Sequence, residues 1–262
     1  MPALSGLLMN ACLLFAGALG IGFVSAIAGI GGGSLLVPFL VLVLGYDVKV
    51  AIATSLVCII VTSASAASIY LGRGMVDLGT ALLIEPSTVL GAIVGAYVTL
   101  TLPATYVRFA LGLVLLYISA TMLKESLIGT KVGETKITKV SKSRKVVGVS
   151  ISFIAGMFSG MFGIGGGVIK VPLLNLIMGL PIKTAVATSS FMVGLTATSG
   201  GAVYLARGLT DPLSVAIIAL GIMPGATLGA KCLRRLKPRI VRLVFSLVLL
   251  YASIRLLITA LI

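Results

Sequence analysis

Long runs of apolar residues recur along the chain and predict membrane-spanning helices. A helix needs roughly 20 residues to cross the hydrocarbon of a bilayer. The first half contains four runs that reach or approach this length: 3–28, 49–71, 78–102 and 106–123. The second half contains four more: 146–163, 184–206, 212–230 and 240–262. Two shorter apolar segments, 34–44 and 168–178, each follow a cluster of glycines. The pattern predicts an all-α polytopic membrane protein.

The second half of the chain repeats the first. Residues 29–123 align with 163–257 without a gap, and more than a third of the aligned residues are identical. Many secondary transporters are built from two related halves, with the substrate site between them. We therefore divide the chain into three parts. They are a first transmembrane repeat at 1–128, a basic linker at 129–145 and a second transmembrane repeat at 146–262.

Composition and charge support a membrane protein and argue against nucleic-acid binding. The chain is 59% hydrophobic and 10% charged, against about a quarter charged in soluble domains. Its net charge is +14, but the basic residues concentrate in two short segments, 129–145 and 231–242, with six in each. Basic loops between spans are expected in the cytoplasm. A nucleic-acid surface would need a basic face on a folded soluble domain.

The uneven charge of the two repeats predicts their orientation. The basic loop 231–242 corresponds to 97–108, where Arg108 is the only basic residue. Because one loop is strongly basic and its counterpart is not, we expect the two loops on opposite sides of the membrane. This placement requires an inverted repeat, with about five membrane elements per half and both termini outside. The alternative is that 168–178 caps a loop, which gives four spans per half and places 231–242 outside. Whether 34–44 and 168–178 cross or re-enter stays open.

The repeated pentad Gly-Ile-Gly-Gly-Gly, at 29–33 and 163–167, joins a long apolar segment to a short one. Such Gly-rich breaks at membrane depth must face protein or a watery cavity. The N–H groups at the start of the following helix suit an anion. We therefore predict that these breaks bind a small anionic substrate. The alternative is close helix packing through small residues. The candidates are Gly31, Gly32, Gly33, Ser34, Gly165, Gly166 and Gly167.

A second repeated motif, Ala-x-Ala-Thr-Ser, opens the span after each short segment. It contributes Thr54 and Ser55 in the first repeat, and Thr188 and Ser189 in the second. Hydroxyls can donate hydrogen bonds to an oxyanion without adding a charge that would trap it. The alternative is that they bond to carbonyls of their own helix.

Two charged residues break the symmetry of the repeats inside apolar segments. Glu85 corresponds to Ala219, and Lys170 corresponds to Leu36. A charge at membrane depth is costly, so each is a functional candidate. Glu85 is a candidate coupling residue that carries a proton or pairs with a lysine. Lys170 either contacts the substrate anion or extends to the membrane surface.

Several classes of chemistry are not predicted. The chain has no histidine, and its three cysteines lack metal-ligand spacing, so we predict no metal, no cofactor and no catalytic residue. No nucleotide-binding P-loop is present. The alternative to a transporter is a membrane-embedded enzyme or assembly factor, which should carry a repeated cluster of histidines or carboxylates within its spans.

The two glycine motifs extend into longer matching segments, Gly29-Ile-Gly-Gly-Gly-Ser-Leu-Leu-Val-Pro38 and Gly163-Ile-Gly-Gly-Gly-Val-Ile-Lys-Val-Pro172. With the Ala-Thr-Ser stretches, they resemble the sulfite exporter TauE/SafE family, also called 4-toluene sulfonate uptake permeases. The resemblance covers essentially the whole chain. It implies a multi-pass secondary transporter of the cytoplasmic (inner) membrane for small sulfur-containing anions such as sulfite, sulfoacetate or other organosulfonates. We expect it to act as an exporter.

Some expectations stay open beside this resemblance. The family is usually described with seven or eight spans, which differs from five elements per half. Family membership does not set the substrate, the direction of flux or the coupling ion. The oligomeric state is also open, and a homodimer is one option.

Overall fold

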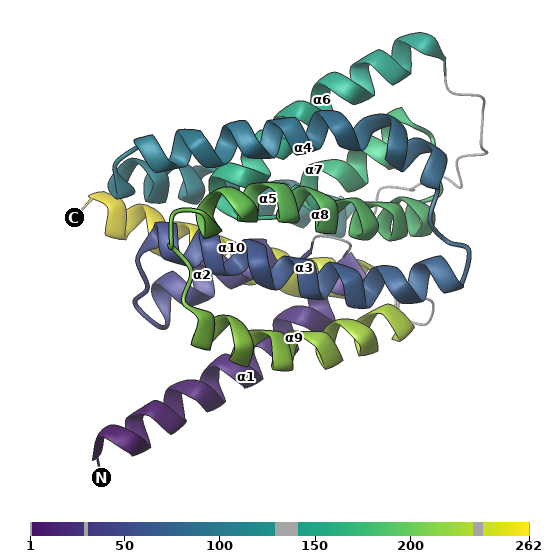
Figure 1. Cartoon of the computed structure of the whole chain (residues 1–262). Coiled ribbons are helices and arrows are strands. Elements are labelled where there is room, and N and C mark those ends of the chain that lie inside the picture. The colour runs from purple at the N-terminus through teal and green to yellow at the C-terminus, as the bar shows by residue number, and fades with distance from the viewer. Residues whose placement is uncertain (1, 29–30, 129–140, 233–237, 262) are drawn as a thin grey trace.

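The computed structural model describes residues 2–28, 31–128, 141–232 and 238–261, and over these ranges every regular element is a helix (Figure 1). The first repeat contains α1 (Pro2–Ala28), α2 (Gly33–Leu42), α3 (Val48–Gly72), α4 (Leu78–Thr101) and α5 (Ala104–Ile128). The second repeat contains α6 (Lys142–Phe162), α7 (Gly167–Pro172), the π-helical η1 (Leu173–Ile177), α8 (Ile182–Leu205), α9 (Pro212–Cys232) and α10 (Pro238–Leu261). The predicted all-α class is confirmed.

The helices match the apolar runs from which they were predicted. Within the described part of the chain, six helices are long and apolar enough to cross a membrane. Most helices lie side by side along a common direction, while α1 and α6 are inclined to the others (Figure 1). Of the two basic segments, residues 129–140 and 233–237 lie outside the described residues.

The outer faces of these helices carry large apolar side chains. Leu90 on α4, Tyr117 on α5 and Leu220 on α9 are each at least 60% exposed. Soluble proteins rarely expose such contiguous apolar surface, whereas a lipid environment favours it. The exposed faces and the long apolar helices together make this a multi-pass membrane protein.

Glycines let helices from different repeats pack backbone to backbone. On α4, a side chain at Gly91 or Gly95 would overlap the backbone of Phe153 or Met157 on α6. The equivalent contacts recur between α9 and α1. There, Gly225 and Gly229 face the carbonyl oxygens of Leu19 and Phe23. Close approach of this kind needs small residues at the interface. Each of these two interfaces therefore joins one helix from each repeat.

Equivalent helices of the two repeats run in opposite directions where they meet. In the α3–α8 pair, Leu56 lies beside Gly201, whereas Ser63, further along α3, donates a hydrogen bond to the Ser190 carbonyl, earlier in α8. In the α5–α10 pair, the Ser119 hydroxyl donates to the Ser246 carbonyl (2.8 Å). Earlier in α5, Gly112 lies against Leu257, later in α10.

The short segment differs between the repeats. In the first, α2 continues as a regular helix through Pro38 to Leu42. In the second, α7 gives way after Pro172 to one π-helical turn, closed by a hydrogen bond from Met178 N–H to the Leu173 carbonyl (3.0 Å). Both repeats have the proline, so the missing N–H does not by itself explain the π-turn. The second repeat has Asn175 in place of Val41, and its side-chain amide donates to the Leu180 carbonyl (2.8 Å).

The α7–η1 segment also returns the chain toward the beginning of α6. A side chain at Gly148, in the second turn of α6, would meet the sulfur of Met178 at 3.0 Å. The chain therefore leaves α6 at Phe162 and comes back to the level of its first turns before α8 begins. This segment moves the chain from one end of α6 to the other, as a crossing element does.

Candidate functional site

An ion pair joins the two repeats inside the protein. The ammonium Nζ of Lys170, on α7, lies 3.0 Å from Oε2 and 3.4 Å from Oε1 of Glu85, on α4. The two side chains are 0% and 5% exposed, respectively. It is the single ion pair among the described side chains. Of the alternatives for Glu85, pairing with a lysine is therefore what the structure shows.

Thr196 of α8 completes this group as a third member. Its hydroxyl lies 2.6 Å from Oε1 of Glu85 and also contacts Nζ of Lys170. It lies 3.1 Å from the carbonyl of Met192 in its own helix. A hydroxyl donates one hydrogen and accepts up to two, so Thr196 can accept from the ammonium while donating to the carboxylate. We call Lys170, Glu85 and Thr196 the charged triad.

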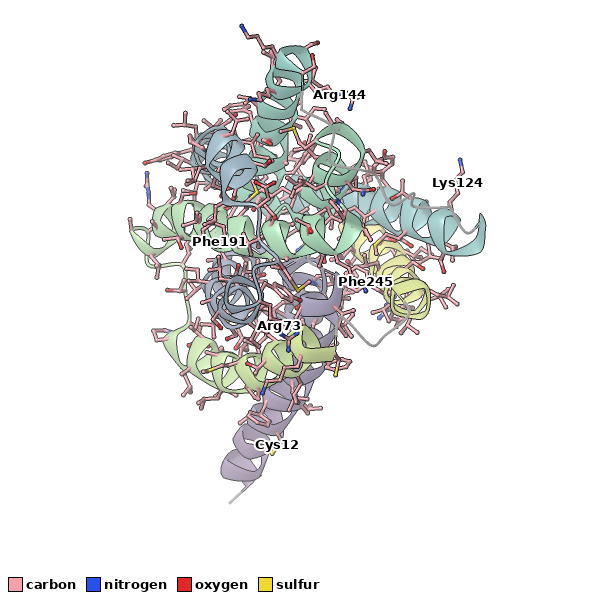
Figure 2. The ribbon with its side chains drawn as sticks, turned by 90° about the vertical axis from the view of Figure 1, so that its right-hand side faces the viewer. Cys12, Arg73, Lys124, Arg144, Phe191 and Phe245 are labelled. Carbon is pink, nitrogen blue, oxygen red and sulfur yellow. The ribbon has the colours of Figure 1, made fainter. Side chains whose placement is uncertain are left out.

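Lys170 does not extend to the surface, so that alternative is wrong. Its side chain is fully buried. The contrast with other basic residues is clear in Figure 2, where Arg144 on α6 and Lys124 on α5 lie at the periphery and point away from the molecule. The ammonium of Lys170 is bound inside the fold by Glu85 and Thr196, and its backbone N–H bonds the Gly166 carbonyl (3.0 Å) in the first turn of α7.

The charged triad is not needed to fill space in this fold. A buried ion pair is weak evidence for stability, because apolar residues of similar volume often serve as well. The equivalent positions of the other pseudo-symmetric interface hold Leu36, which is fully buried, and Ala219. One repeat interface thus contains the charged residues, and the equivalent interface has uncharged residues at the same positions. Packing alone therefore does not require the triad.

The glycine turns before α2 and α7 adopt backbone conformations that other residues avoid. Gly31 and Gly32 have φ angles of 81° and 90°, and Gly165 and Gly166 have 75° and 70°. Residues with side chains reach this left-handed region only at a cost of about 1–2 kcal/mol. The carbonyls of Gly32 and Gly166 then accept the first hydrogen bonds of α2 and α7.

The structure brings the two glycine clusters into contact. A side chain at Gly33, the first residue of α2, would overlap the carbonyl oxygen of Gly163 and crowd Ile59. The same Gly163 carbonyl accepts a hydrogen bond from the Ser55 hydroxyl (2.9 Å). At Gly33 the alternative of close packing therefore applies, since protein backbone fills the space where a side chain would lie. Gly167 is equivalent to Gly33 and begins α7.

The repeated hydroxyls have divergent environments. Ser55 is engaged with Gly163, and Thr188 accepts a hydrogen bond from the backbone N–H of Asp77 (2.9 Å). Ser189 is fully buried. Ser34 and Thr54 are also fully buried, and their hydroxyl oxygens have no hydrogen-bond partner. Buried hydroxyls are usually bonded, so Ser34 and Thr54 stay candidates for a ligand contact.

A second polar cluster lies at the start of α9. The Tyr46 hydroxyl donates to Oδ2 of Asp211 (3.2 Å), and the Ser214 hydroxyl donates to the same oxygen. The hydrogen bond from Ser214 lowers the pKa of Asp211 below its ordinary value, so this carboxyl is ionised at neutral pH. Leu180 is the equivalent of Tyr46, and Asp77 is the equivalent of Asp211, so Asp77 cannot receive the same bond from a tyrosine.

Sequence reasoning singled out Lys170 and Glu85 separately but missed Thr196 as their partner. The signal was weak, because Thr196 has an identical counterpart, Thr62, and the break in symmetry lies in its neighbours. The described residues contain no group of three or more His, Cys, Asp or Glu placed to hold a metal ion. The site offers a buried ammonium with the Thr196 hydroxyl beside it, which suits an anion.

A bundle of apolar helices with charges buried between two repeats is the architecture of a membrane transporter. Residues 14–256 match the sequence profile described as "Sulfite exporter TauE/SafE". The chain belongs to the sulfite exporter TauE/SafE family, a family of membrane transporters.

Curated relatives agree with this assignment. The chain is 29% identical over 247 residues to a probable membrane transporter protein, YunE, of Bacillus subtilis, covering 87% of this chain and 90% of that protein. It is 28% identical to a probable membrane transporter protein of Methanocaldococcus jannaschii, covering 87% and 88%. A shorter match, 39% over 88 residues, links it to sulfite exporter TauE/SafE family protein 6 of Arabidopsis thaliana, covering 34% and 20%. No solved structure gives a significant match.

Proposed function

We propose that this protein is a secondary transporter that exports small sulfur-containing anions, such as sulfite, sulfoacetate or other organosulfonates, across the cytoplasmic membrane. The observation that carries the proposal is the fully buried ammonium of Lys170, one turn beyond the glycine turn at Gly166. An anion is the ligand that such a group attracts. The family name and the transporter names of the relatives support the same class.

The substrate site that we propose lies around Lys170 and the Thr196 hydroxyl beside it, rather than between Gly33 and Gly163, where the backbones touch. Ser34 and Thr54 are further candidates for a substrate contact, because each has a buried hydroxyl without a partner. The glycine turns contribute by setting the positions of α2 and α7, whose first-turn N–H groups favour negative charge.

A reconstitution experiment tests this function. Purified protein in proteoliposomes is offered radiolabelled sulfite, sulfoacetate and taurine, with imposed pH or sodium gradients. We expect saturable movement of at least one of the sulfur-containing anions. Folded protein that moves none of them, while control liposomes remain tight, would contradict the proposal.

We further propose that the two repeats form an inverted repeat. The opposite directions of α3 and α8, and of α5 and α10, support it. So do the equivalent contacts of α4 with α6 and of α9 with α1. The return of α7–η1 to the start of α6 gives an odd number of elements per half. In this topology the segments 129–145 and 231–242 are cytoplasmic, and both termini are outside.

The inverted repeat predicts that equivalent loops lie on opposite sides of the membrane. Gly74 and Gly208 are equivalent, exposed, and free of any neighbour within 4 Å of an added side chain. In a background without Cys12, Cys58 and Cys232, a cysteine at 74 should react with an impermeant thiol reagent only from inside. A cysteine at 208 should react only from outside.

Cysteines at positions 135 and 236, which lie outside the described residues, provide matching references from the basic segments. Both should be labelled only from inside. Labelling of 74 and 208 from the same side, or of 236 from outside intact cells, would rule out the inverted arrangement.

A further inference from the structure

In the charged triad, the carboxylate of Glu85 occupies the place beside the Lys170 ammonium where a substrate anion would bind. Lys170 is fully buried, and its ammonium is neutralised by Glu85 at 3.0 Å. An anion that binds this ammonium must compete with the carboxylate for the same charge. If Glu85 loses its contact with Lys170 and stays ionised, it becomes an unpaired charge in a low-dielectric interior, which is strongly unfavourable. Taking up a proton removes that charge.

We propose that Glu85 is an internal stand-in for the substrate and that one proton is carried with each anion. This inference rests on the proposed function, since it requires that an anion binds at Lys170. In the empty site, Lys170 is paired with ionised Glu85. When the anion arrives, Glu85 forms an O–H bond with a proton from water on the side of entry, and the anion takes its place beside the ammonium. Release reverses both steps.

Thr196 is placed to support both states of this exchange. Its hydroxyl contacts Lys170 and lies 2.6 Å from Oε1 of Glu85. It can donate to the ionised carboxylate, and it can accept from the protonated one, because a hydroxyl does either. Its bond to the Met192 carbonyl (3.1 Å) gives its hydrogen a second acceptor when it no longer donates to Glu85. Thr196 is therefore a positioning residue for the exchange.

Among the described residues of the helices that pack around α4, no charged group other than Lys170 faces Glu85. From α7 the charged neighbour is Lys170, and η1 carries no charge. The charged residues of α6, which are Lys142, Arg144 and Lys145, are exposed in its first turn, and Lys183 of α8 is exposed. Tyr204 of α8 is titratable, but its hydroxyl is bound to the Gly160 carbonyl (2.9 Å). The exchange therefore involves one carboxylate and one ammonium.

Charge bookkeeping of the two states gives a testable property. The empty site, with Lys170 and ionised Glu85, has no net charge. The loaded site, with Lys170, a monoanion and protonated Glu85, also has none. Transport should therefore be electroneutral. The direction of flux is set by the anion gradient and the pH gradient together, so outward movement follows when cytoplasmic anion is in sufficient excess.

The experiment measures accumulation in proteoliposomes driven by a pH gradient or by a potassium–valinomycin potential, each applied alone. With wild-type protein we expect about tenfold accumulation of a monoanionic sulfonate per unit of pH gradient. We also expect no accumulation from the potential, and uptake of one proton per anion. In Glu85→Gln, the amide imitates the protonated acid, so the empty site carries one positive charge and the loaded site none. This variant should lose the response to pH and gain one to potential, approaching about 50-fold per 100 mV.

The Asp211→Asn variant is the matched control, because it removes a carboxylate that bonds Tyr46 and Ser214 rather than Lys170. It should keep the wild-type response. Wild-type accumulation driven by the potential and not by pH would overturn the inference while leaving anion transport intact. So would retained pH coupling in Glu85→Gln. If the wild-type protein moves no anion at all, the result would instead contradict the proposed function. If Glu85→Gln does not fold, the wild-type proton count and its response to potential still decide the matter.

Discussion

Valine in place of Gly32 or Gly166 is expected to abolish transport while leaving membrane insertion intact. The two glycines have φ angles of 90° and 70°, and a β-branched residue is poorly suited to either. The strain is on the order of 1–3 kcal/mol at each position. An added side chain would also lie 3.2 Å from the Ser25 hydroxyl at Gly32, and 3.0 Å from the Ala155 carbonyl at Gly166. The start of α2 or of α7 would have to move.

In the second repeat, a shift at the start of α7 would also move the charged triad. The carbonyl of Gly166 accepts the bond from Lys170 N–H, so a shift at Gly166 displaces the ammonium from Glu85. Insertion depends on the long apolar helices, which the change does not touch. The measurement is anion flux into proteoliposomes at equal amounts of inserted protein.

Gly45→Val is the control for this prediction. Gly45 has a φ of 70°, like Gly166, but an added side chain there would meet nothing within 4 Å. It therefore carries the same backbone strain without crowding and away from α7. Gly33 would be a poorer choice, because its side chain would overlap the Gly163 carbonyl and the result would report on packing. Normal transport in both Gly32→Val and Gly166→Val would mean that the turns only pack helices and that the site lies elsewhere.

The helices could be predicted from the sequence because their apolar runs have the length that a bilayer requires. Their ends were less well predicted where polar residues extend a helix. The run 106–123 becomes α5, which continues to Ile128 through Lys124. The run 146–163 becomes α6, which already begins at Lys142. A helix can continue past its apolar run through residues with long basic side chains. A count of apolar residues therefore does not locate the end of the helix.

The contacts of the site could be predicted only in part. Comparison of the repeats singled out Glu85 and Lys170, since each lacks a charged counterpart. That the two meet depends on the packing of α4 against α7 and α8, and hydrophobic periodicity does not say which helices are neighbours. The contact between Gly33 and Gly163 could not be predicted for the same reason. The π-turn of η1 contains Asn175, whose amide bonds the Leu180 carbonyl, and the equivalent residue of the first repeat, Val41, gave no indication of it.

Removing the ammonium of the triad should have a large effect on both stability and transport. In Lys170→Met, Glu85 remains buried without its partner, because Lys170 is the charged group that faces it. Breaking a buried pair by removing one member typically destabilises a protein by about 3–5 kcal/mol. The variant also loses the positive charge that we propose binds the substrate. We therefore expect a clear fall in the thermal unfolding temperature and a loss of anion binding of about 100-fold or more.

The double variant Lys170→Met/Glu85→Gln separates these two effects. It removes both charges and leaves two uncharged residues. The equivalent positions, Leu36 and Ala219, are also uncharged. Most of the lost stability should return, since no buried charge is left unpaired. Anion binding should not return, because the ammonium is still absent. Thermal unfolding in detergent and equilibrium binding of labelled sulfite measure the two quantities on the same preparations.

Lys183→Met is the matched control, because Lys183 is exposed near the start of α8 and makes no ion pair with a described side chain. It should change neither the unfolding temperature nor anion binding appreciably. Wild-type anion affinity in Lys170→Met would show that the substrate is bound elsewhere. Recovery of both stability and anion binding in the double variant would assign the pair a purely structural role. Recovery of stability alone is the result expected if the buried ammonium is the group that holds the anion.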